Sequence, residues 1–99
     1  MIVNICGVPH EVIECEDNFS DDLHLGIIDF KNAIIKINGS ATKEIKEETI
    51  CHEVIHGILV HIGRDELSQD ETFVQSLSNA IFQSFTIKDT GSEQKPTVF

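Results

Sequence analysis

The chain has 99 residues, enough for one domain with a single modest core. Hydrophobic residues make up 40% of the chain and charged residues 24%, a globular composition that excludes the disordered and fibrous classes. The 7 basic and 17 acidic residues give a net charge of −10, which argues against a nucleic-acid-binding protein and permits a basic protein or peptide partner.

The cysteines and the N-terminal sequence predict a cytoplasmic protein. Cys6, Cys15 and Cys51 are odd in number and form no CxxC pair, so we expect free thiols in a reducing compartment. The first residues, MIVNICGVPHEV, lack the basic region that begins a signal peptide. No apolar run approaches the roughly 20 residues that a membrane span needs. We therefore expect no association with a membrane.

The first half of the chain predicts four short strands. The β-rich runs MIVNIC (1–6) and HEVIEC (10–15) flank the turn residues GVP, a pattern typical of a hairpin. The runs HLGIIDF (24–30) and AIIKIN (33–38) flank the residues KN and predict a second hairpin. A polar segment, EDNFSDD, connects the two pairs.

The second half predicts two helices. The first runs to about Ile62, with Ser40 or Thr42 as its N-cap and Gly63 as a C-terminal cap. The second covers residues 69–85, where the apolar positions follow the 3.6-residue period: Phe73, Val74, Leu77, Ala80, Ile81 and Phe85.

This order of elements predicts the α+β class. Strands that precede helices favour an antiparallel sheet with helices on one face. Residues 1–87 would form the single domain. Residues 88–99 lose the periodic pattern and predict a flexible C-terminal tail.

The first helix contains the pattern HExxH at His52, Glu53 and His56. Residues at positions i and i+4 lie on the same side of a helix, so two imidazoles can meet at one Zn²⁺. Glu53 lies to the side of this pair, where its carboxylate can take a proton from a water whose pKa the metal lowers. The spacing therefore supplies two metal ligands and a general base.

The apolar surroundings of the pattern favour a metal site. The alternative is two partly exposed histidines beside a solvated glutamate. However, the helix from Ile50 to Ile62 is apolar on nearly every side, which is typical of a buried helix. Buried histidine and glutamate need partners, and one metal ion would satisfy all three residues.

A third ligand is expected, because catalytic zinc usually has three protein ligands and one open position. His61 comes one residue too early for the HExxHxxGxxH pattern and is rotated by about 140° from His56. A glutamate or aspartate on the next helix is the other source, and Asp70 and Glu71 are the candidates. Ser68 and Glu71 also fit a capping box, in which Glu71 would bind the helix N-terminus instead of a metal.

The segments ETICHEVIHGILVHIG and DETFVQSLSNAI resemble the ImmA/IrrE-type metallopeptidases of phages and mobile elements. The resemblance covers roughly residues 24–85 and includes the segment GIIDFKNAIIKIN. It implies a minimal zincin-like domain of gluzincin type, with zinc between the sheet-bound helix and the next one. His52, His56 and Glu71 would be the metal ligands, and Glu53 would be the catalytic base.

The chain departs from the resemblance in two respects. We expect no additional domain that could select a substrate. The chain also contains no tyrosine, so the phenol with which some zincins stabilise the oxyanion is missing. His10, His24 or His61 could substitute, although each is more simply explained as an ordinary polar residue.

We therefore expect an intracellular zinc metallopeptidase that cleaves a protein or peptide partner. In zincins the substrate commonly lies along a sheet edge, and residues 33–38 are our candidate for that edge. The alternative is a non-catalytic, zinc-stabilised module that binds a protein. A metal-free helical interaction domain is a third hypothesis. The sequence does not specify the substrate, the oligomeric state, or zinc over other divalent ions that suit imidazole and carboxylate.

Overall fold

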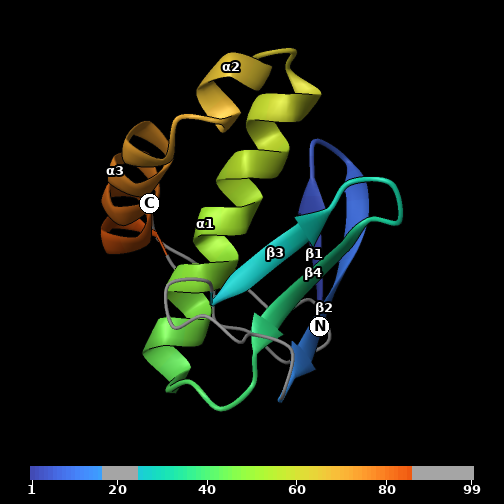
Figure 1. The fold of residues 1–99 in the computed structure, drawn as a ribbon, viewed down its shortest axis with the longest axis vertical. Helices are drawn as coiled ribbons and strands as arrows, with labels where there is room; N and C mark the ends of the chain where they lie inside the picture. The colour runs from blue at the N-terminus through green and yellow to red at the C-terminus, as the bar shows by residue number, and fades with distance from the viewer. Residues whose placement is uncertain (17–24, 86–99) are drawn as a thin grey trace.

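A computed structural model describes residues 1–16 and 25–85 and shows a four-stranded sheet with helices on one face (Figure 1). Helix α1 (Lys43–His61) crosses this face, and α3 (Glu71–Ser84) packs on the side of α1 away from the sheet. The predicted α+β class is confirmed. The predicted tail, residues 88–99, lies outside the described residues.

The first predicted hairpin is formed by β1 (Ile2–Ile5) and β2 (Val8–Cys15), which pair antiparallel. Two residues connect them, and both have positive φ, 51° for Cys6 and 83° for Gly7. Positive φ at both central positions defines the type I′ turn, whose twist matches that of the flanking strands.

The second predicted hairpin is formed by β3 (Gly26–Asp29) and β4 (Ile34–Asn38). The carboxylate of Asp29 closes its turn by accepting hydrogen bonds from the backbone N–H of Asn32 at 3.1 Å and from its side-chain amide at 2.9 Å. Such a local bond from an aspartate is typical of turns.

The two hairpins meet through a parallel pair of strands, so the sheet is mixed. The strand order is β1-β2-β4-β3, and β4 runs parallel to β2. The expectation of a purely antiparallel sheet is therefore wrong, and so is the expectation that residues 33–38 form an edge. The physical reason is burial, because Ile35 and Ile37 of β4 are almost fully buried in a central strand. The edges of the sheet are β1 and β3, and β3 is the edge strand next to β4.

Helix α1 is buried on two sides, as its apolar sequence predicts. On the sheet side, Ile50 packs in one core cluster with four residues of the sheet: Ile5, Val12, Ile35 and Ile37. On the other side, Ile55 and Leu59 form a second cluster with Val74 of α3. Because α1 lies between two apolar layers, only a narrow strip of its surface can carry polar groups.

Both ends of α1 are capped as predicted. The side chain of Thr42 accepts a hydrogen bond from the Ile45 N–H, so Thr42 rather than Ser40 is the N-cap. At the other end, Gly63 has a φ of 80°, and the N–H of Arg64 donates to the carbonyl of Leu59 at 2.8 Å. This pattern is a Schellman motif, which stops the helix and turns the chain.

The expected connection between the two helices contains a one-turn helix, α2 (Asp65–Ser68). It brings the chain back beside α1, so that α3 begins next to the middle of α1 (Figure 1). Among the described residues, no helix combines the length and the apolar character that crossing a membrane requires.

Close packing at Gly26 holds the edge strand β3 against α1. A Cβ atom at this position would lie 2.4 Å from the Cγ2 of Thr49 and 3.4 Å from the Cγ of Glu53. Real Cβ atoms do not approach other atoms as closely as 2.4 Å, so any side chain at position 26 would require either the Thr49 side chain or the β3 backbone to shift.

We predict that Gly26→Ala lowers the free energy of unfolding by about 1–3 kcal/mol, because overpacking forces such a shift. Urea denaturation measures the change. Thr49→Ser removes the methyl group that the new Cβ would meet, so the double variant should recover most of the loss. If Gly26→Ala and the double variant are equally destabilised, contact with Thr49 is not the cause.

Candidate metal centre and adjoining cleft

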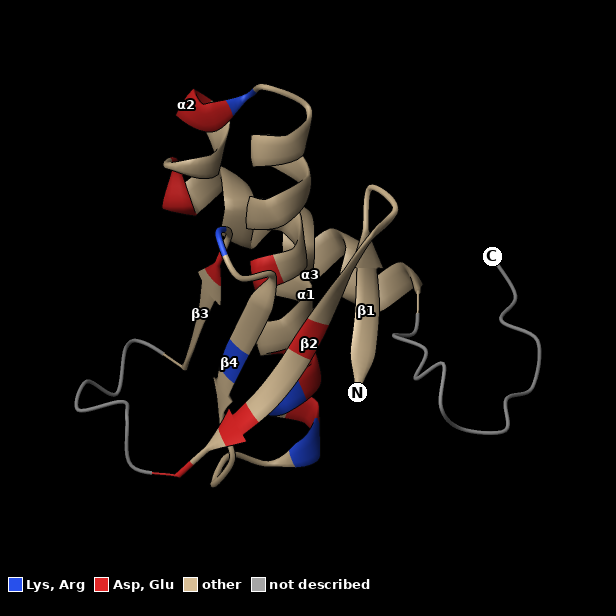
Figure 2. Ribbon diagram, turned by 90° about the vertical axis from the view of Figure 1, so that its right-hand side faces the viewer, with Lys and Arg blue, Asp and Glu red and all other residues tan. Residues whose placement is uncertain are grey.

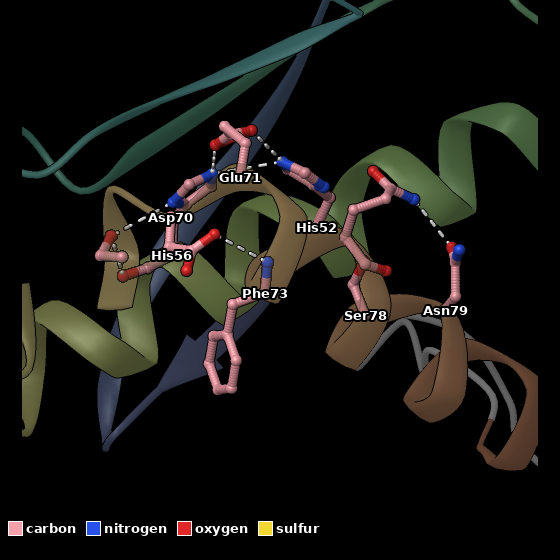
Figure 3. A network of polar contacts seen from close by, with 9 residues as sticks. His52, His56, Asp70, Glu71, Phe73, Ser78 and Asn79 are labelled. Carbon is pink, nitrogen blue, oxygen red and sulfur yellow. Dashed lines mark hydrogen bonds and ion pairs between the residues drawn. The ribbon is translucent and has the colours of Figure 1, made fainter. Parts of the chain in front are cut away.

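The two histidines of the HExxH pattern project from α1 toward the start of α3. Their Nε2 atoms face each other at 3.2 Å (Figure 3). A tetrahedral metal with ligands at about 2.0–2.1 Å separates neighbouring donor atoms by about 3.3 Å. The spacing of His52 and His56 therefore matches the edge of a tetrahedral zinc site.

Glu71, the first residue of α3, places its carboxylate opposite the two imidazoles (Figure 3). One oxygen lies 2.7 Å from the Nε2 of His56 and the other lies 3.2 Å from the Nε2 of His52. The donor atoms of the three residues all lie within 4.8 Å of one another, so the group could hold a metal ion. The structure thus brings together the three residues predicted as ligands.

Asp70, the other candidate for the third ligand, caps α3 instead. It is the N-cap of α3, and its carboxylate accepts a hydrogen bond from the Phe73 N–H at 3.1 Å (Figure 3). The capping box between Ser68 and Glu71 is therefore absent, and that alternative is wrong. Because Asp70 takes the cap, the side chain of Glu71 can extend toward α1.

Ser68, which the sequence suggests as a cap, binds His56 instead. Its Oγ lies 3.1 Å from the Nδ1 of His56 and 3.3 Å from the carbonyl oxygen of the same residue. When the hydroxyl donates its proton to the carbonyl, it can accept a hydrogen bond from Nδ1–H. The tautomer with its proton on Nδ1 is the one whose Nε2 can bind a metal.

The protonation of His56 also follows from its burial. The side chains of His52 and His56 are 17% and 14% exposed, whereas that of Glu71 is 66% exposed. Burial lowers the pKa of His56, although the neighbouring Glu71 carboxylate opposes this shift. A lowered pKa keeps the imidazole neutral at pH 7, as a metal ligand must be.

Glu53 lies beside this group and is only 7% exposed. With His52 it lines a cleft of about 220 Å³ between α1, the edge strand and α3. The remaining lining residues are Leu25, Gly26, Ile45, Glu48, Thr49 and Gln75. A carboxylate of limited exposure therefore lies at the border between a candidate metal site and a cleft of side-chain size.

The structure does not bring the other histidines into the group. His10 is buried, with its Nδ1 2.9 Å from the carbonyl oxygen of Val8, and its ring contacts that of the exposed His61. His24 lies outside the described residues. The three cysteines are free, and burial raises the pKa of Cys51, which keeps that thiol protonated.

Two features of the site could not be read from the sequence. One is the bond between Ser68 and His56, since the pattern SxxE points to a cap instead. The other is the cleft, whose walls come from three separate elements. Comparison of the chain with protein-family models, with curated proteins and with solved structures gave no match.

We predict that Glu71→Ala mainly weakens metal binding and that Asp70→Ala mainly lowers the stability of the fold. Glu71→Ala should weaken metal binding steeply, and its loss of stability should largely vanish when both proteins are free of metal. Asp70→Ala should keep the metal affinity but lose about 0.5–2 kcal/mol of stability, because a helix cap is removed. Zn²⁺ titration calorimetry and urea denaturation measure the two effects. Equal metal affinity of Glu71→Ala and wild type would place the third ligand elsewhere.

We further predict that Ser68→Ala lowers metal affinity about 10- to 100-fold, as loss of a hydrogen bond to a ligating histidine typically does. The matched control is Ser84→Ala, which removes a hydroxyl that donates to a carbonyl of its own helix at 2.8 Å, away from the group. Competition with a zinc-binding dye measures the affinities. Indistinguishable affinities of the two variants would contradict the role of Ser68 in orienting His56.

Proposed function

We propose that this protein is an intracellular, cytoplasmic zinc metallopeptidase of the ImmA/IrrE type that cleaves a protein partner. The observation that carries the proposal is the convergence of two imidazole nitrogens and one carboxylate at 2.7–3.2 Å, with Glu53 next in sequence to one ligand. Zinc favours this combination of nitrogen and oxygen donors.

Three protein ligands suit a catalytic site rather than a structural one. Structural zinc sites are closed by four protein ligands, whereas catalytic sites keep one position for water or substrate. Within the parts of the chain that the structure describes, the group contains three donors and no fourth. Its most exposed member is Glu71, so the approach for a substrate lies on the side of that residue.

Zinc, when bound, supplies a Lewis acid that lowers the pKa of water and polarises a peptide carbonyl. His52, His56 and Glu71 hold it in place. Glu53 takes a proton from the attacking water and delivers it to the leaving amine, as a general base that then acts as a general acid. Its low exposure limits competing water at that step.

The edge strand β3 is the element along which the substrate would lie. Its residues pair on one side with β4, and Gly26 at its start lies against Thr49 and Glu53 of α1. A peptide added to the side of β3 that no described strand occupies would use backbone hydrogen bonds and would pass next to Glu53. Strand β3 thus takes the role that we expected of residues 33–38.

A second candidate function, a zinc-stabilised module that binds a protein without cleaving it, is favoured by one observation. The chain has no tyrosine, and among the described histidines His10 and His61 lie outside the three-residue group, so neither is placed to stabilise an oxyanion there. The two functions differ in what they require of Glu53.

Replacement of Glu53 by glutamine tests the proposal. The amide is close to the carboxylate in size, so the variant should fold and keep about one zinc per chain. Its rate of peptide cleavage should fall about 10²–10⁴-fold, the usual contribution of a general base. The substrate is a proteome-derived peptide library, cut beforehand after acidic residues, and new termini are counted by mass spectrometry.

His52→Ala serves as the matched control, because it should lose both zinc and cleavage. A Glu53→Gln protein that lacks zinc would make Glu53 a ligand or a support of one. Zinc-loaded wild type that cleaves no peptide and no protein would favour the binding module.

A further inference from the structure

The cleft beside the candidate metal centre has a chemical character of its own. We propose that it binds the side chain of a lysine or arginine in the substrate, and that Glu48 selects this cation. The inference rests on the proposed function, since it places the bound side chain next to the bond that is cleaved. The argument comes from the shape, the hydrogen-bonding groups and the charges of the cleft.

The floor of the cleft is one stripe of α1. It consists of residues at helical spacing that lie on one side of the helix: Ile45, Glu48, Thr49, His52 and Glu53. Leu25 and Gly26 form the wall on the side of the sheet, and Gln75 forms the wall on the side of α3. The cleft therefore starts at the metal ligand His52 and extends toward the N-terminal end of α1.

The apolar parts of the lining suit a long aliphatic stem. Leu25 and Ile45 contribute hydrocarbon to the lining, and Gly26 leaves space because it has no side chain. Lysine and arginine bury such stems along apolar surface and keep their charged ends in polar surroundings. A volume of about 220 Å³ is sufficient for one such side chain and too small for a folded element.

The polar groups of the lining present several acceptors. The hydroxyl of Thr49 donates its proton to the carbonyl of Ile45 at 2.7 Å, so its oxygen can accept. One N–H of the Gln75 side chain donates to Asn79 at 2.8 Å, and the Gln75 side-chain oxygen is an acceptor. Ammonium and guanidinium groups are donors only. The cleft thus complements them and disfavours a substrate carboxylate.

The charges of the cleft point to the same ligand. Glu48 and Glu53 both line it, and none of its described lining residues is a lysine or arginine. Figure 2 shows where the basic residues of the described chain lie, at the turn before β4, on β4 itself, at the start of α1 and before α2. Two of these cations already have partners, Lys46 with Glu14 and Arg64 with Glu66.

Glu48 lies where it could bind the substrate cation without involving Glu53, the proposed base. Glu48 precedes His52 by one helical turn, about 6 Å along the axis, which is within reach of the four-carbon stem of a lysine that begins near His52. Glu48 is exposed, whereas Glu53 is buried. A cation at Glu48 therefore remains partly hydrated and does not occupy the carboxylate that serves as the base.

The first test measures binding to the cleft without catalysis. Two-dimensional NMR follows the backbone amides of the whole chain during titration with n-butylammonium, n-pentanol or pentanoate. We expect the cation to shift the amides of Leu25, Glu48 and Gln75 more than the alcohol does, and pentanoate to have no effect there. Glu48→Gln should weaken the cation about three- to fivefold, as loss of a partly exposed ion pair does.

Glu47→Gln is the matched control, because it makes the same change of charge on the neighbouring residue, which does not line the cleft. If the cation and the alcohol bind equally, or if Glu47→Gln and Glu48→Gln weaken the cation equally, the inference is wrong.

The second test separates this inference from the proposed function. In the peptide library, wild type should cleave next to lysine or arginine at one fixed position, and Glu48→Gln should lose that preference, so that sites with and without a basic residue at that position are cut at similar rates. Cleavage without a basic preference would overturn the inference alone. Absence of any cleavage would overturn the proposed function, and the NMR titration would then decide whether the cleft binds a basic side chain.

Discussion

The burial of α1 on two sides is the constraint on which the other features of this protein depend. One side faces the sheet and the other faces α3, so both must be apolar. Polar side chains are confined to the strip between them, and buried polar groups are costly unless they are bonded. Within that strip, His52 and His56 face Glu71, His56 also binds Ser68, and Glu53 borders the cleft. Position on the helix surface therefore decides which side chains meet.

The turn after α1 brings Glu71 next to the two histidines on this strip. The Schellman motif at Gly63 ends the helix, and the single turn of α2 returns the chain toward α1. Ser68, at the end of α2, is buried and bonded to His56, which fixes the register of the return. Asp70 then caps α3, and Glu71 follows at the position where its carboxylate reaches both imidazoles. If the segment between α1 and α3 were longer or shorter, a residue other than Glu71 would stand opposite the two imidazoles.

Local features of the sequence were sufficient for most of the elements and for two of the three donors. The hairpins, both long helices, the caps at Thr42 and Gly63, and the pair of His52 and His56 follow from periodicity, turn residues and the HExxH spacing. Glu71 was one of two candidates, with Asp70, and the family resemblance favoured it. The parallel pairing of β2 with β4 did not follow, because strand order depends on contacts between distant segments. The bond from Ser68 to His56 was missed because a local capping pattern competed with a tertiary one, and Asp70 formed the cap instead.

The proposed metal and the proposed basic substrate residue would both reduce the repulsion between carboxylates near His52. Glu48 lines the cleft beside His52, and Glu71 lies against His52 from α3, in a chain whose net charge is −10, so like charges repel one another there. A divalent cation at the histidines would offset the charge of Glu71, and a substrate cation would offset that of Glu48. Each proposed cation would stabilise a different carboxylate, so the substrate residue could be exchanged without loss of the metal. A neutral residue at position 48 would relieve the repulsion permanently, but it would also remove the preference for a basic substrate.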